Sequence, residues 1–71
     1  MIDLKKIKRL REEKGLSIEE ISKHLGFKTY QGYYKLERGI RRIRVDHLIK
    51  LSKILNVDIK DLILEEKDEH N

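Results

Sequence analysis

The chain has 71 residues and a formal net charge of +4, which allows one domain with a single small core and suits acidic partners. It holds no cysteine, and His24, His47 and His70 are too widely spaced to share a helical face, so no metal site and no cofactor are expected. The apolar runs are only a few residues long, which excludes a membrane span and a secretion signal and favours the cytoplasm.

The first half of the chain shows apolar residues at the three- and four-residue spacing of a helix. Two stripes follow this spacing: Leu4, Ile7 and Leu10, then Ile18, Ile21 and Leu25. Asp3 can cap the first helix and Gly15 can end it. Ser17 and Glu20 have the spacing of a capping box for the second helix, which Gly26 ends. Two helices joined by a short turn are therefore predicted.

The second half of the chain shows three more segments with helical spacing. Their apolar stripes are Tyr33 with Leu36, then Val45, Leu48, Leu51, Ser52 and Leu55, and finally Ile59, Leu62 and Ile63. Thr29 can cap the third helix and Gly39 can end it, while Asn56 and Asp58 separate the last two segments. These signals predict an all-α domain of five helices over residues 1–64. Residues 65–71, EEKDEHN, have no apolar anchor, so we expect an acidic disordered tail there.

The third predicted helix has two different faces when its residues are placed at about 100° intervals. Tyr33 and Leu36 share one side, and Glu37 borders it. The opposite side gathers polar, aromatic and cationic groups: Gln31, Tyr34, Lys35 and Arg38. Glutamine can pair with adenine, lysine with guanine, and tyrosine with phosphates or thymine methyl groups. This face therefore favours nucleic-acid binding, and an ordinary amphipathic surface is the alternative.

The charges around this helix agree with a polyanionic partner. Residues 28–44 contain six basic side chains and one acidic side chain, Glu37. Residues 1–64 hold 16 of the 17 basic residues and 9 of the 13 acidic residues. Such a block suits nucleic acid, although a solvated, salt-bridged surface is the alternative on charge alone.

Gly32 interrupts the third helix, where glycine costs about 1 kcal/mol relative to alanine. It lies at the margin of the packed side. We expect its missing side chain to let the helix that bears Ser22 approach closely, and space for a ligand is the alternative.

Four stretches of the chain resemble a known family. LKKIKRLREEKGLSIEEISKHLGF, YYKLERG, LIKLSKILNV and IKDLI are similar to the Cro/repressor-type (xenobiotic-response-element, XRE) helix-turn-helix domain of bacteria and phages. The resemblance covers residues 3–64 and implies a five-helix, lambda-repressor-like fold. It also implies that the second and third helices form the helix-turn-helix, with residues 29–38 as the recognition helix in the major groove.

The function implied by the resemblance is transcriptional regulation through double-stranded DNA, with a repressor of phage or mobile-element type as the first hypothesis. The alternative is an antitoxin-like module that binds a partner protein and uses DNA binding for autoregulation. An enzyme is not expected, because the sequence shows no nucleophile–base pair, metal cluster or phosphate-cradling glycine loop.

The resemblance also implies roles for individual residues. The base-reading positions are Thr29, Tyr30, Gln31 and Lys35, and the face of the third helix adds Tyr34. The phosphate-binding positions are Ser17, Arg38, Arg41, Arg42 and Arg44, and the basic block adds Lys28. Two features depart from the family pattern. Ile18 stands where glutamine often contacts a phosphate, and the FKT turn is one residue longer than the commonest form.

Arg11 and Glu37 are predicted to form a structural ion pair. Arg11 shares the inward side of the first helix with Leu4 and Ile7, and Glu37 borders the packed side of the third. The family commonly pairs these positions, while the alternative is two exposed charges.

A homodimer is the predicted assembly, because one recognition helix reads only a few base pairs. Two copies would bind a pseudo-palindromic operator, either as a preformed dimer or by pairing only on DNA. Ile54 points roughly 130° away from the stripe of its helix, and Leu64 departs similarly from the last segment. These two residues are the predicted dimer interface, and no small-molecule ligand is expected.

Overall fold

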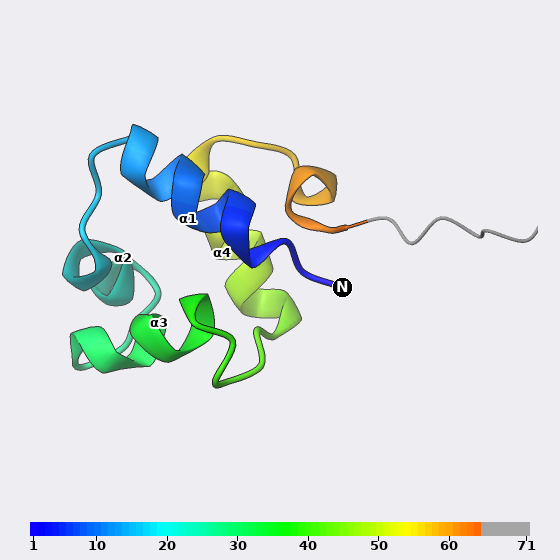
Figure 1. The fold of residues 1–71 in the computed structure, drawn as a ribbon. Helices are drawn as coiled ribbons and strands as arrows, with labels where there is room; N and C mark the ends of the chain where they lie inside the picture. The colour runs from blue at the N-terminus through cyan, green and yellow to red at the C-terminus, as the bar shows by residue number, and fades with distance from the viewer. Residues whose placement is uncertain (65–71) are drawn as a thin grey trace, which may run out of the picture.

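The computed structural model describes residues 1–64, and the predicted tail over residues 65–71 lies outside the described part. Four α-helices are followed by one 3-10 helix: α1 (Leu4–Glu13), α2 (Ile18–His24), α3 (Tyr30–Glu37), α4 (Val45–Leu55) and η1 (Ile59–Leu62). In Figure 1, α2 and α3 lie together at one end of the molecule, and η1 lies near the N-terminus at the other. The predicted all-α fold is confirmed, with the correction that the fifth segment is a short 3-10 helix.

Local hydrogen bonds begin the first two helices as predicted. The Asp3 carboxylate accepts the N–H of Lys6 at 3.1 Å at the start of α1. At the start of α2, the Ser17 hydroxyl accepts the N–H of Glu20 at 3.0 Å, and the Glu20 carboxylate accepts the N–H of Ser17 at 2.8 Å. This reciprocal capping box satisfies two backbone donors that the helix itself leaves without partners.

The start of α3 is held differently from the prediction. Thr29 precedes the helix, but its side chain makes no capping hydrogen bond. Instead, the buried Ser22 hydroxyl of α2 donates to the Thr29 carbonyl at 2.6 Å and accepts the N–H of Tyr33 at 3.2 Å. One small side chain therefore fixes α3 directly onto α2.

The core lies between the helices and uses every predicted stripe. Its buried side chains are Ile7, Ile21, Leu25, Tyr33, Leu36, Leu48, Leu51, Leu55 and Leu62. Val45 and Ile63 are corrections, because both were predicted in core stripes and both are exposed. Ile54 is a further correction: it is half-buried and packs against the core. The buried arc of α4 is wider than a single stripe, because η1 also packs on this helix.

The two ends of the described chain pair with each other. Ile2 and Ile63 form an isolated antiparallel bridge. The Asp3 N–H donates to the Leu62 carbonyl at 2.9 Å, and the Leu64 N–H donates to the Met1 carbonyl at 2.7 Å. The N-terminal segment is thereby fastened beside η1, an arrangement that helical periodicity did not indicate.

Candidate nucleic-acid interface

The inner side of α3 is anchored by a buried polar network. Arg11 Nε donates to Glu37 Oε2 at 2.9 Å, and Arg11 Nη1 donates to the Leu16 carbonyl at 2.8 Å. The Tyr33 hydroxyl donates to the same Glu37 oxygen at 3.2 Å. The two charges paired in the sequence analysis are thus in contact, and they tie α1 to α3.

The network also shifts the pKa values of two of its members, Tyr33 and Arg11. Burial, followed by the nearby Glu37 charge, raises the pKa of the Tyr33 hydroxyl above its ordinary value, so Tyr33 is a neutral donor. Burial opposes the charged form of Arg11, but the hydrogen bond and charge of Glu37 outweigh it and raise the Arg11 pKa. Arg11 therefore keeps its charge inside the domain, where its Nε lies 2.9 Å from Glu37 Oε2.

Phe27 explains why α3 contains a glycine. A Cβ added at Gly32 would collide with the Phe27 side chain, which comes from the turn between α2 and α3. The expectation that Gly32 admits the backbone of the Ser22 helix is therefore wrong, since an aromatic ring occupies the space. Phe27 also lies 5.4 Å from the His47 ring of α4, and the Arg41 guanidinium lies 5.8 Å from the Phe27 ring centre.

The outer side of α3 carries the predicted polar face. Gln31, Lys35 and Arg38 are exposed, and Tyr34 is half-buried. The rings of Tyr30 and Tyr34 pack edge to face, with their centres 6.2 Å apart. The Arg38 guanidinium lies 5.6 Å from the Tyr34 ring centre. Tyr30, Tyr34 and Arg38, each four residues apart, thus form a continuous row that we call the tyrosine row.

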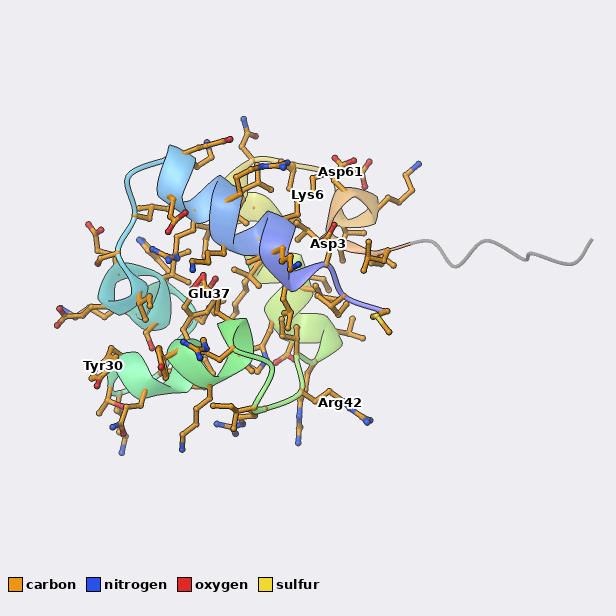
Figure 2. The ribbon with its side chains drawn as sticks, in the orientation of Figure 1. Asp3, Lys6, Tyr30, Glu37, Arg42 and Asp61 are labelled. Atoms are coloured by element: carbon orange, nitrogen blue, oxygen red, sulfur yellow. The ribbon has the colours of Figure 1, made fainter. Side chains whose placement is uncertain are left out.

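The predicted phosphate-binding residues flank α3. Lys28 is exposed in the turn before α3, next to exposed Thr29. Three more lie after it: Arg41, Arg42 and Arg44 are all exposed within residues 38–44, here called the basic loop. Figure 2 shows Tyr30 and Arg42 on the outer side of the molecule, whereas Glu37 points inward toward α1. The structure thus places basic side chains at both ends of the exposed face of α3.

Two positions at the start of α2 have different surroundings. Ser17 is exposed, and its hydroxyl accepts the capping N–H of Glu20. Ile18 is half-buried and packs against the core, so the residue that departs from the family pattern has a structural role here.

Sequence reasoning missed the contributions of Phe27 and His47. His47 Nδ1 accepts the N–H of Arg44 at 3.4 Å, at the junction of the basic loop and α4. Phe27 and His47 together connect the turn before α3 with the start of α4. The sequence offered one signal for the role of Phe27, which is its position five residues before Gly32. Only the fold shows that Phe27 and Gly32 are in contact.

Comparison with known proteins identifies the family. A family model described as helix-turn-helix matches residues 7–62, a range that includes α2, the following turn and α3. No curated protein and no solved structure gives a significant match. Every helix within residues 1–64 is too short or too polar to cross a membrane. The matched range spans most of the chain, and the chain belongs to the XRE family of DNA-binding helix-turn-helix domains.

Proposed function

We propose that the protein is a sequence-specific transcriptional regulator, a repressor of phage or mobile-element type, that inserts α3 into the major groove of double-stranded DNA. The observation that carries this proposal is the division of α3 into two sides. The inner side is locked by Tyr33, Leu36 and Glu37, and the outer side is free to meet base edges. Because the buried inner side fixes α3 in place, its exposed face loses little conformational freedom when it binds DNA.

Base recognition is assigned to the exposed face of α3. The amide of Gln31 matches the donor and acceptor of adenine, and the ammonium of Lys35 matches the acceptors of guanine. Thr29 and Tyr30 lie at the start of the helix, where a methyl group and an aromatic ring suit the thymine methyl. Tyr34 completes the face beside Lys35.

Phosphate binding is assigned to the residues around that face. Lys28 precedes α3, Ser17 begins α2, and the arginines of the basic loop follow α3. Such contacts hold the protein in register on the duplex without reading sequence. Each one releases bound counterions, so binding is expected to weaken steeply as salt rises.

Two copies are expected on a pseudo-palindromic operator. Their recognition helices would enter major grooves one helical turn, about 34–36 Å, apart. This arrangement doubles the number of bases read by a small domain and raises specificity accordingly.

The experiment begins with selection of bound duplexes from a random DNA pool. Gln31→Ala or Lys35→Ala is then expected to weaken binding to the selected site by about 1–3 kcal/mol and to relax base preference. Arg42→Ala is expected to weaken all sequences alike and to lower the salt slope by about one unit.

Lys53→Ala is the matched control, because Lys53 is an exposed lysine in the last turn of α4, away from the proposed face. It is expected to keep the wild-type base preference. Unchanged affinity and preference in both Gln31→Ala and Lys35→Ala would contradict the assignment of α3 as the recognition helix.

A further inference from the structure

The Phe27 side chain contacts three elements around the proposed DNA-binding face. Phe27 belongs to the turn between α2 and α3, where its N–H donates to the Ser22 carbonyl at 3.0 Å. Its ring lies against Gly32 of α3, and the ring centre is 5.4 Å from that of His47 on α4. The Arg41 guanidinium of the basic loop lies over the same ring, 5.8 Å from its centre. These distances are those of an aromatic contact and a cation–π contact.

Arg41 is held through both its backbone and its side chain. Its N–H donates to the Lys35 carbonyl at 3.2 Å, which ties the basic loop to the last turn of α3. Its guanidinium reaches back to Phe27, which lies in the turn before α3. The Arg41 side chain therefore extends beside α3, although Arg41 is exposed.

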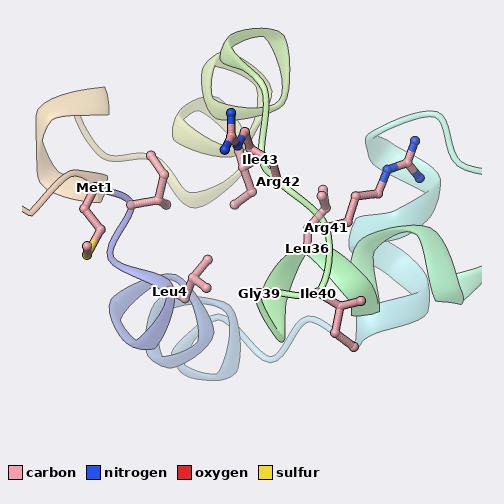
Figure 3. Close-up of a pocket in the computed structure, with 9 residues that line it drawn as sticks. Met1, Leu4, Leu36, Gly39, Ile40, Arg41, Arg42 and Ile43 are labelled. Atoms are coloured by element: carbon pink, nitrogen blue, oxygen red, sulfur yellow. The ribbon is translucent and has the colours of Figure 1, made fainter.

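Arg42 provides a comparison, because it is the next residue of the basic loop and is also exposed. Both arginines line a groove of about 740 Å³, and Figure 3 shows their side chains pointing in different directions. Of the two, Arg41 is the one whose guanidinium lies over the Phe27 ring. The Phe27 contact therefore distinguishes one of two neighbouring candidates for phosphate binding.

We propose that Phe27 is a positioning residue for DNA binding, because its ring holds the Arg41 guanidinium beside α3 for a phosphate contact. The proposal rests on the proposed function. A guanidinium over an aromatic face can still direct the N–H groups at its edge toward a phosphate. Because this side chain is already held in the free protein, it loses less conformational freedom on binding than a mobile arginine would.

The contact with Gly32 places this phosphate contact next to base recognition. Gly32 directly follows Gln31, the residue assigned to adenine. The ring that contacts Gly32 also holds Arg41, and His47 supports the ring from the side of α4. The phosphate bound by Arg41 therefore lies close to the bases that α3 reads.

A role in core packing alone is the alternative for Phe27, which is half-buried and packs against the core. Leucine is a tolerated replacement where a side chain only fills apolar space. An aromatic ring, in contrast, is needed to attract a guanidinium to its face. The two roles therefore predict different DNA binding by Phe27→Leu.

The test is a double-mutant cycle measured on a duplex of random sequence, where phosphate contacts supply the affinity. Arg41→Ala is expected to weaken binding and to lower the salt slope by about one unit. Phe27→Leu is expected to weaken binding about two- to tenfold, which corresponds to ordering one long side chain on binding. In the Arg41→Ala background, most of the effect of Phe27→Leu should disappear.

Arg42→Ala is the matched control, because it removes an exposed arginine from the same loop. Its effect and that of Phe27→Leu are expected to add, whereas a general loss of structure would affect both arginines alike. Phe27→Tyr keeps the ring and is expected to bind within about twofold of the wild type. Melting temperatures show that each variant is folded under the conditions of the assay.

Additive effects of Phe27→Leu and Arg41→Ala would overturn the proposal, as would equal coupling of Phe27 to Arg41 and to Arg42. Unchanged binding by Arg41→Ala, or equal losses in Phe27→Tyr and Phe27→Leu, would also contradict it.

A second measurement needs no variant and decides the question if Phe27→Leu does not fold. In NMR spectra of the free wild-type protein, the Phe27 ring protons are expected to show close contacts to the Arg41 side chain. An Arg41 side chain with the averaged signals of a mobile arginine would refute the positioning role. Failure of the wild type to select any duplex from a random pool would instead contradict the proposed function itself.

Discussion

The inner side of α3 packs against α1 and α2, whereas the outer side meets solvent. The polar groups of the inner side have specific partners: Glu37 accepts from Arg11 and from the Tyr33 hydroxyl, and the N–H of Tyr33 donates to the Ser22 hydroxyl. On the outer side, the exposed Gln31 and Lys35 contribute little to the core and can change without disturbing it. This difference shows that residues on one side of a helix can stabilise the domain while residues on the other side are left to determine specificity.

Breaking the inner side at its ion pair is expected to have the largest effect. Arg11→Leu leaves the Glu37 carboxylate buried without its cation and should lower the free energy of unfolding by about 3–5 kcal/mol. The double variant Arg11→Leu/Glu37→Leu should lose less, because no lone charge stays buried. Urea unfolding of both single variants and the double variant gives the coupling energy.

The control for this cycle is Arg9→Leu. Arg9 also pairs with a glutamate, Glu13 at 3.7 Å, but both side chains are exposed, so its loss should cost less than about 1 kcal/mol. A coupling energy near zero between Arg11 and Glu37 would show that the inner network does not hold the helix.

Adding a methyl group at Gly32 tests how tightly the inner side of α3 is packed against Phe27. Helix propensity alone predicts that Gly32→Ala stabilises α3 by about 1 kcal/mol. The collision of the new methyl group with Phe27 should outweigh this gain and give a net loss of about 1–2 kcal/mol. Adding Phe27→Leu should recover part of the loss in thermal unfolding, whereas a more stable Gly32→Ala would show that Phe27 moves aside freely.

Substitutions in the tyrosine row test the outer side of α3, where we expect a change in DNA affinity. Tyr34→Leu removes the ring beneath the Arg38 guanidinium and should lower DNA affinity by about two- to fivefold, the size of an exposed cation–π contact. Tyr34→Phe keeps the ring and should retain most of the affinity. In an Arg38→Ala background Tyr34→Leu should have a smaller effect, limited to what the Tyr34 ring contributes by its own contact with the bases. Equal losses in Tyr34→Phe and Tyr34→Leu would assign the effect to the hydroxyl instead.

The smallest expected effect concerns the exposed carboxylate of Glu20, which interacts with Ser17 at the start of α2. The Ser17 N–H, followed by the Ser17 hydroxyl, holds the pKa of the Glu20 carboxyl below its ordinary value of 4.5. Because the folded pKa is lowered, this stabilisation is complete above pH 4.5 and disappears as pH falls through the folded pKa. The stability difference between wild type and Glu20→Gln should therefore be constant near neutral pH and shrink in acid. Urea midpoints between neutral and acidic pH measure it, and a difference that grows in acid would contradict it.

Much of the fold could be predicted from the sequence, because the interactions involved are short-range. The caps at Asp3 and Ser17 join residues three apart, and the core stripes recur every three or four residues. The same periodicity separated the two faces of α3 and so named Gln31, Tyr34 and Lys35, whereas the family resemblance added Thr29 and Tyr30. Their role in DNA binding remains a prediction.

Tertiary structure alone decided how those helices meet. Ser22 caps α3 from α2, Phe27 occupies the space beside Gly32, η1 packs on the helix that carries Ile54, and Met1 and Ile2 pair with Leu64 and Ile63. Hydrophobic periodicity shows which side of a helix is buried but not which partner buries it, since that depends on how all the helices fill one core together.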